Sequence, residues 1–299
     1  MKDSTKQFSK MLGTDSAEKA LHMYLYVKYL PHYIYHVSNP AGLVERRPPF
    51  EIPSDIEEMI EIITRKVSKD SVSRETSTYH GKIVPLKQAI DLISVNEDIE
   101  LKNLEKVVPY KIARDIVIKH PLKIAVFDCA CRLLHDNPCK PLDVCLAVGD
   151  PFASFLIEHE VLNARMVSVD EAVSILESEH RRGHVHGAYF KDVAGDRFYA
   201  ICNCCACCCI GMKAWTRLKI PIISHSGYIP AISGECDACG ECEKICPFGA
   251  IRVEDAAVFD TDLCMGCGVC EGACPVGAIN LTPDSSKGEP LDIITLLNK

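Results

Sequence analysis

The sequence predicts an α/β protein whose middle part contains a mostly parallel sheet, between a helical N-terminal region and a small cysteine-rich C-terminal module. Three observations support this prediction. Residues 1–110 contain no cysteine and show mainly helical patterns. Between residues 111 and 232, buried-strand patterns alternate with helical ones, as in layered α/β proteins. A cysteine motif then occurs twice within residues 233–283, and residues 284–299 remain as a tail.

The N-terminal region is expected to be a series of helices. Capping residues at positions 14–18 open the first helix, and Pro31 interrupts it. The other helical candidates are Asp55–Val67, Pro85–Ile93 and Leu101–His120, the last with a break at Pro109.

The middle part alternates between the two kinds of element. The expected strands are Lys123–Asp128, Ala164–Val167, Arg197–Ile201 and Ile220–Ile223. The expected helices are Phe152–His159, a helix that the Ser168–Glu171 capping box starts and that ends near Gly183, and Gly211–Arg217. Gly227–Gly234 is expected to be a linker.

Composition indicates a cytoplasmic, metal-binding protein. The chain has 299 residues, 47% of them hydrophobic, which is enough to form a core. It shows neither a signal-peptide pattern nor an apolar run of the roughly 20 residues that a membrane span needs. Cysteine is the outlier, with 18 residues. In a cytoplasmic chain, closely spaced cysteines favour metal binding over disulfides, and so many thiolates suggest an anaerobic setting.

The C-terminal cysteine motif is duplicated. CDACGECEKICPFGAI begins at Cys236 and CMGCGVCEGACPVGAI at Cys264, and 10 of the 16 aligned positions are identical. Each copy has the spacing Cys-x2-Cys-x2-Cys-x3-Cys-Pro, in which three thiolates on a tight loop reach one cluster. Small residues let the loop close around it (Ala238, Gly240, Gly266 and Gly268). Structural zinc is the alternative, but zinc sites seldom use this triple spacing.

The duplicated motif closely resembles that of bacterial two-cluster ferredoxins. The resemblance covers roughly 50 residues and implies an α+β ferredoxin-like module with two [4Fe–4S] clusters. It implies that one cluster is held by Cys236, Cys239, Cys242 and Cys274. It implies that the other is held by Cys264, Cys267, Cys270 and Cys246.

Ten further cysteines lie in the middle part, in two groups. The first has the spacing Cys-x-Cys-x7-Cys-x5-Cys and consists of Cys129, Cys131, Cys139 and Cys145. The second is denser and consists of Cys202, Cys204, Cys205, Cys207, Cys208 and Cys209. Each group begins just after an expected strand. If the two strands are parallel, both groups meet at one edge of the sheet and build one or two additional clusters.

We expect the first group to bind one [4Fe–4S] cluster and a subset of the second to bind another. Side chains alternate in extended chain, so Cys202 and Cys204 face away from Cys205, Cys207 and Cys209, and one compact cluster cannot use all six. Zinc is the rival ligand here, and buried free thiols explain one or two of these cysteines. The patterns CxCR, EHRRGHVH and CNCCxCCC also resemble uncharacterised cysteine-rich ferredoxin-domain proteins of anaerobic prokaryotes.

Polar residues near these cysteines are further candidates. His184 and His186 lie on one side of the chain if that segment is extended, where they can ligate iron or donate a proton; a polar loop at a helix end is the alternative. Arg132, Arg181 and Arg182 either offset the charge of an anionic cluster or are simply solvated.

These features favour an electron-transfer protein or redox subunit. The resemblance implies that the ferredoxin-like module passes single electrons to the middle part. Residues 235–299 carry 12 Asp and Glu against four Lys and Arg, which suits a basic docking surface on a redox partner and argues against nucleic acid binding. The alternatives are a catalytic oxidoreductase that reduces a small molecule or disulfide, and an accessory protein that stores or inserts clusters.

Overall fold

The computed structural model describes residues 1–12, 17–69, 79–102, 104, 106–109, 116–191, 194 and 197–298. Helices dominate the N-terminal region, as predicted. They are α1 (Asp3–Leu12), α2 (Ala17–Lys28), α3 (Leu30–Ser38), the short 3-10 helix η1 (Asn39–Ala41) and α4 (Ser54–Lys69). The expected capping residues at positions 14–16 lie outside the described residues.

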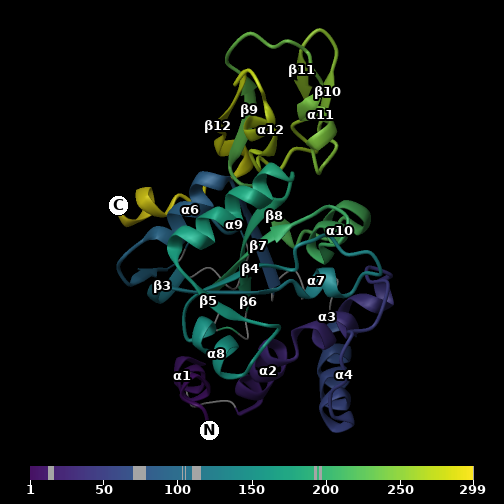
Figure 1. The fold of residues 1–299 in the computed structure, drawn as a ribbon, viewed down its shortest axis with the longest axis vertical. Coiled ribbons are helices and arrows are strands. Elements are labelled where there is room, and N and C mark those ends of the chain that lie inside the picture. Colours follow the sequence, from purple (N-terminus) through teal and green to yellow (C-terminus); the bar gives the residue numbers. More distant parts are fainter. Residues whose placement is uncertain are drawn as a thin grey trace.

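One sheet forms the centre of the molecule (Figure 1). Its strands are β1 (Tyr79–Val84), β2 (Ile99–Leu101), β3 (Ile116–Asp128), β4 (Asp143–Asp150), β5 (Arg165–Val167), β6 (Val185–Lys191), β7 (Arg197–Cys204) and β8 (Ile223–Ser224). The order is β2-β3-β4-β7-β6-β1-β8, with β5 also paired to β3. Only the β1–β8 pair is parallel among these pairings. The sheet is therefore mixed and mostly antiparallel, and it curls into a half-barrel.

The prediction of a mostly parallel sheet is wrong because it missed β4 and β6. A parallel connection needs a crossover of a dozen or more residues, usually a helix. Only five residues separate β6 from β7, so those strands are antiparallel neighbours. Between β3 and β4 there is only the short helix α7 (Ala130–Leu133). The expected helix at Leu101–His120 is also wrong, because the β-branched run from Ile116 belongs to β3.

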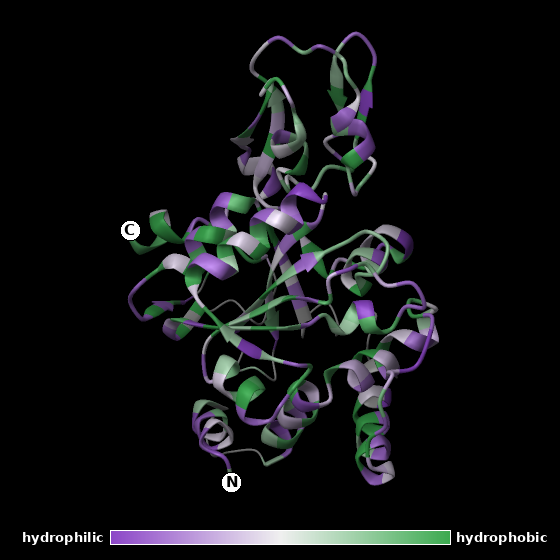
Figure 2. Ribbon diagram, viewed as in Figure 1, coloured by the Kyte–Doolittle hydropathy of each residue, from purple (hydrophilic) through white to green (hydrophobic). Residues whose placement is uncertain are grey.

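Side chains of the central strands alternate between two cores. In β3, Ile124 and Val126 face a core that includes α6 (Leu86–Ser94) and α9 (Val169–Arg181). Ala125 and Phe127 face the opposite core, with the N-terminal helices and α8 (Phe152–Glu158). Figure 2 shows hydrophobic residues along these strands and mixed polarity along the outer helices. The remaining body helix, α10 (Ile210–Leu218), directly follows the second cysteine group.

The C-terminal module stands at one end of the body (Figure 1). Its elements are β9 (Tyr228–Ile232), α11 (Glu241–Ile245), β10 (Ile251–Val253), β11 (Ala257–Phe259), α12 (Val269–Ala273) and β12 (Ile279–Pro283). β9 pairs with β12 and β10 with β11, both antiparallel. The predicted small α+β module is confirmed. The expected linker at Gly227–Gly234 is instead largely the strand β9.

The last residues pack back onto the body. They form η3 (Ser285–Lys287) and α13 (Ile293–Leu297), and Leu291 and Ile293 are buried in the same core as α6 and α9. In the part of the chain that the structure describes, no helix has the length and apolar character required to cross a membrane.

Candidate metal centres of the C-terminal module and the central sheet

One pocket of the C-terminal module is lined by cysteines from both copies of the motif. Cys264, Cys267 and Cys270 line it, and so does Cys246 from the other copy. These four residues are the set that the resemblance implies for one cluster. Burial raises the pKa of Cys264, and it raises the pKa of Cys270 to about 12. Their thiols are therefore protonated at neutral pH until metal binding displaces the protons.

The cysteine loops of the two copies share an unusual backbone. Gly240 and Gly268 have φ values of +78° and +80°, and Ala238 and Gly266 have φ values of +53° and +65°. A Cβ added at Gly266 would lie 2.0 Å from the carbonyl oxygen of Tyr228. Glycine is therefore required at that position for two reasons, backbone conformation and space. Ala238 adopts the same left-handed conformation without that crowding.

The other cysteine set of the module is less enclosed. Cys242 is buried and Cys239 is exposed, while Cys236 and Cys274 are intermediate. Cys236, Cys242 and Cys274 belong to one packed cluster of side chains. Burial raises the pKa of Cys242, and the neighbouring Cys236 and Cys239 also raise it. The ligand assignment of both sets stays a prediction from the resemblance.

Both cysteine groups of the middle part lie at one edge of the central sheet. β3 and β7 each run antiparallel to β4, which lies between them, so they point in the same direction. Their carboxyl ends therefore meet at the same edge, although the sheet is mostly antiparallel. Cys129 directly follows β3, and Cys204 ends β7. Across this edge, however, the ten cysteines sort into sets that differ from the two sequence groups.

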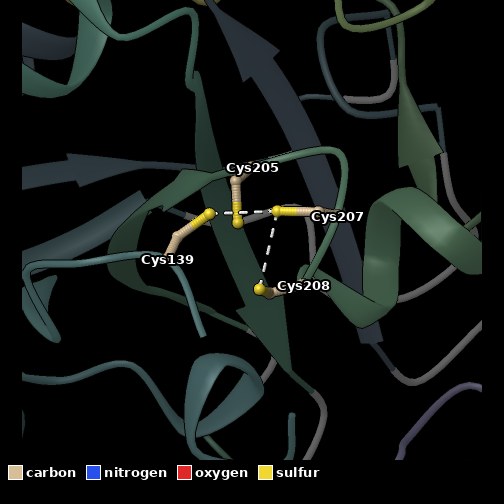
Figure 3. A group of neighbouring side chains, drawn as sticks. All are labelled: Cys139, Cys205, Cys207 and Cys208. Atoms are coloured by element: carbon tan, nitrogen blue, oxygen red, sulfur yellow. Dashed lines mark hydrogen bonds between the residues drawn. The ribbon is translucent and has the colours of Figure 1, made fainter. Parts of the chain in front are cut away.

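The first set, which we call the four-thiol group, consists of Cys139, Cys205, Cys207 and Cys208. Their sulfurs all lie within 4.8 Å of one another. Figure 3 shows Cys139 reaching from the loop before β4 toward three residues of the turn after β7. The sulfur of Cys207 lies 3.0 Å from that of Cys139 and 3.6 Å from that of Cys208. Four sulfurs around one tetrahedral ion at about 2.3 Å are about 3.8 Å apart, so this group has the size of a single-ion site.

The second set, which we call the six-thiol ring, surrounds a buried cavity. It consists of Cys129, Cys131, Cys145, Cys202, Cys204 and Cys209, all of which line that cavity. Cys205 of the four-thiol group also lines it, so the two sets are neighbours. Neighbouring thiols of the ring shift one another's pKa values in pairs. The pairs are Cys202–Cys145, Cys145–Cys129, Cys129–Cys131, Cys131–Cys209 and Cys209–Cys204. Tyr189 Oη lies 3.5 Å from the sulfur of Cys204. Hydrogen bonds from Cys131 and Cys145 lower the pKa of Cys129.

Arg132 lies wholly buried beside both sets. Its Nη2 donates to Glu179 Oε2 at 2.7 Å and to the carbonyl oxygen of Asn203 at 3.3 Å, and its Nη1 donates to the carbonyl oxygen of Pro141. Burial raises the pKa of Glu179, but hydrogen bonds from His184 and Arg132 outweigh it and lower that pKa to about 2. The Nε of Arg132 has no hydrogen-bond partner among the described residues.

Two buried histidines connect the C-terminal module to the sheet. His180 of α9 stacks on His186 of β6, with ring centroids 5.3 Å apart, and its Nδ1 lies 3.2 Å from Nε2 of His186. The backbone of Gly268 lies near His180 and acts to raise its pKa. His186 Nδ1 lies 2.6 Å from Oδ1 of Asn203, which stands between Cys202 and Cys204. Burial lowers the pKa of both histidines, that of His186 to about 3.

The predicted site residues are thus found in new combinations. The structure does not bring Cys129, Cys131, Cys139 and Cys145 together as one set, because Cys139 joins the four-thiol group. The dense run does divide between two sets, but Cys209 lies with Cys202 and Cys204. His184 contacts Glu179 at 2.7 Å, and His186 lies in the histidine pair. Arg181 and Arg182 are exposed, unlike Arg132.

Sequence reasoning missed His180, Glu179 and Asn203. His180 and Glu179 lie in the same EHRRGHVH segment that drew attention to His184 and His186, and Asn203 lies inside the dense cysteine run. Their positions inside these two motifs were a usable signal. Their partners could not be predicted, because Arg132, the partner of Glu179, lies on α7, far away in the sequence.

The comparisons with known proteins bear on the C-terminal module. Residues 235–286 match the family model of the 4Fe–4S dicluster domain. This part of the chain is therefore a 4Fe–4S dicluster domain that carries two [4Fe–4S] clusters. Together with the cysteine sets of the middle sheet, it makes an iron–sulfur redox protein the function that the findings suggest. A search of curated proteins gave no match.

Proposed function

We propose that this protein is an electron-transfer protein or redox subunit whose dicluster domain exchanges single electrons with metal centres at the β3–β7 edge of the central sheet. When bound, the clusters supply one-electron chemistry. The chain supplies their thiolate ligands, excludes water from them and connects them.

The observation that carries this proposal is the contact of His180 with the dicluster domain. Helix α9, which carries His180, packs against α12, and α12 begins two residues after Cys267. A Cβ added at Gly272 would lie only 2.7 Å from Nε2 of His180, so the ring packs against α12 with no room between them. From His180 the contacts continue through His186 to Asn203.

This arrangement is a continuous, buried connection between two cysteine-rich regions. It starts in the loop that contains Cys267 and ends at the strand that carries Cys202 and Cys204. Both imidazoles are neutral at pH 7 because burial lowers their pKa values, so no uncompensated charge stands in the connection.

The acidic charge of the dicluster domain supports a protein partner. Eight of the acidic side chains in the domain belong to exposed residues: Glu235, Asp237, Glu241, Glu243, Glu254, Asp255, Asp260 and Asp262. We infer that the physiological donor or acceptor presents a basic docking surface. The rate of electron transfer between partner and protein should then fall as ionic strength rises from 0.01 M towards 0.15 M, since the Debye length shrinks from about 30 Å to about 8 Å.

The experiment is rapid-freeze EPR after anaerobic mixing with one electron equivalent of a reduced protein donor. The signal of the dicluster domain should form first and then decay as the middle part is reduced. His180→Leu should slow the second phase without changing the metal content. The control variant His36→Leu, on α3, should leave the rate of the second phase unchanged. An unchanged second phase in His180→Leu would remove the support for this connection.

A pocket beside the six-thiol ring favours a second candidate function, that of a catalytic oxidoreductase. It has a volume of about 130 Å³ and is lined by Cys131, by apolar side chains of α3 and α10, and by Lys191. Lys191 is buried, with its Nζ 5.5 Å from the ring centre of Tyr26. Such a pocket fits a small, largely apolar molecule. An enzyme should show an EPR or absorption spectrum that shifts with cyanide or carbon monoxide; a carrier should not.

A further inference from the structure

We propose that the six-thiol ring binds a polynuclear iron–sulfur cluster that is separate from the metal ion of the four-thiol group. The two sets differ in geometry, in enclosure and in the groups that surround them. The inference rests on the proposed function only in the choice of iron and sulfide as the bound cofactor. It does not depend on the connection through His180.

The geometry of the ring excludes a single-ion site. Among the described residues, only the four-thiol group has three or more ligand atoms that converge on one point. The thiols of the six-thiol ring instead line one cavity from several elements. A ring of ligands around a space suits a cofactor that fills the space.

The number of thiols leads to the same conclusion. A tetrahedral metal ion takes four thiolates, so six thiols in one enclosure provide ligands for at least two ions. The enclosed volume is about 50 Å³, well above the roughly 10–15 Å³ that one water requires. Metal ions bridged by inorganic sulfide would fill this volume and would bind each thiol as its thiolate, with release of its proton.

Arg132 provides an independent observation. It lines the same cavity, is wholly buried, and retains an Nε–H donor without a partner among the described residues. A buried donor left unpaired is costly, and an anionic cluster with sulfide acceptors would satisfy it. Arg132 is also the one positively charged residue that lines the cavity, so it compensates part of the negative charge of a thiolate-bound cluster.

The walls of the cavity suit a buried cluster. Phe127, Leu30 and Ile34 line it on the side of the N-terminal helices, and Tyr189 and Tyr199 line it from the sheet. Tyr199 is hydrogen-bonded to Tyr26 at 2.6 Å, and Tyr189 to Cys204. These side chains keep water away from the ring, whereas the four-thiol group includes the exposed Cys207.

The test compares two double variants of the full chain, Cys129→Ser/Cys145→Ser in the ring and Cys139→Ser/Cys207→Ser in the four-thiol group. Iron, zinc and acid-labile sulfide are measured per chain under anaerobic conditions. The ring variant should lose iron together with sulfide. The four-thiol variant should lose metal without sulfide, because a single ion bound by four thiolates carries none.

The EPR signals of the dicluster domain serve as the internal control for folding. If they persist while the ring variant keeps its full iron and sulfide content, the inference is overturned and the proposed function still stands. Loss of zinc instead of iron and sulfide from the ring variant also overturns it. Should the double variant fail to fold, the single variant Cys202→Ser, at a less buried position of the ring, is measured in the same way.

Discussion

The imidazole of His180 stacks on that of His186 with an interplanar angle of 16°, inside the interface between the dicluster domain and the central sheet. His180 belongs to a helix that contacts the domain, and His186 belongs to a strand that leads to the cysteines. The pair therefore joins two parts of the chain that are separated by more than 60 residues of sequence, since Gly268 lies that far beyond His186. Both rings are buried in this interface.

Removing one cysteine of the dicluster domain should affect one cluster only. Cys267→Ala should remove or convert the cluster whose expected ligands line the pocket with Cys246, because an alanine cannot bind iron. Iron content and EPR spectra of the reduced protein measure this. Cys239→Ala is the matched variant in the other copy of the motif. Unchanged iron content and spectra in both variants would refute the ligand assignment.

Gly266→Ala should destabilise the domain more than an alanine at an uncrowded glycine. The added Cβ would lie 2.0 Å from the carbonyl oxygen of Tyr228, which belongs to the backbone and cannot move alone. Gly277 also has a positive φ, +63°, but nothing lies within 4 Å of an added Cβ. Gly277→Ala should cost about 1–2 kcal/mol, and Gly266→Ala distinctly more. Anaerobic denaturant unfolding measures both; equal costs would contradict the crowding argument.

Glu179→Gln should lower the free energy of unfolding by roughly 3–5 kcal/mol, because it leaves the buried Arg132 without its carboxylate partner. Both side chains of this pair are 1% exposed. Glu171→Gln on the same helix is the control, since its partner Arg165 and Glu171 itself are more than 40% exposed. That variant should change stability by less than about 1 kcal/mol. Similar losses in the two variants would show that the buried pair has no special weight.

The contribution of the Glu179 carboxylate to the free energy of unfolding should decrease as the pH falls. Its pKa is about 2 in the folded protein against an ordinary value of 4.5, since hydrogen bonds from His184 and Arg132 outweigh burial. The carboxylate therefore stabilises the fold fully above about pH 4.5, and this contribution is lost as the pH falls towards 2. The stability difference between wild type and Glu179→Gln should narrow over that range. A difference that stays constant down to pH 3 would contradict the lowered pKa.

The local patterns of the chain were predictable where short-range rules decide them. Ser168 caps α9 by accepting a hydrogen bond from the backbone N–H of Glu171, as its capping box indicates. The duplicated motif is visible in the spacing of its cysteines alone. Sheet direction was not predictable in this way, because β4 and β6 combine cysteine, histidine and glycine with their apolar residues and were hidden between stronger patterns.

The grouping of the cysteines depends on contacts between distant segments. Cys139 and Cys145 are close in sequence, but the first belongs to a loop and the second to β4, so they end in different sets. Alternation predicts that Cys205 faces away from Cys202 and Cys204; Cys205 joins the four-thiol group but also lines the cavity of the ring. Alternation does not hold beyond the turn at Ala206–Cys208, which returns Cys209 to the ring. Sequence alone therefore identified the region in which these cysteines gather but not its two sets.

The most direct test of this account is the iron and sulfide content of the chain, purified without oxygen and enriched in ⁵⁷Fe for Mössbauer spectroscopy. The dicluster domain accounts for the eight iron atoms of two [4Fe–4S] clusters. The account predicts iron and sulfide in excess of these, with the excess in an environment distinct from that of the domain. Eight iron atoms or fewer, with zinc or no metal in the central sheet, would contradict it.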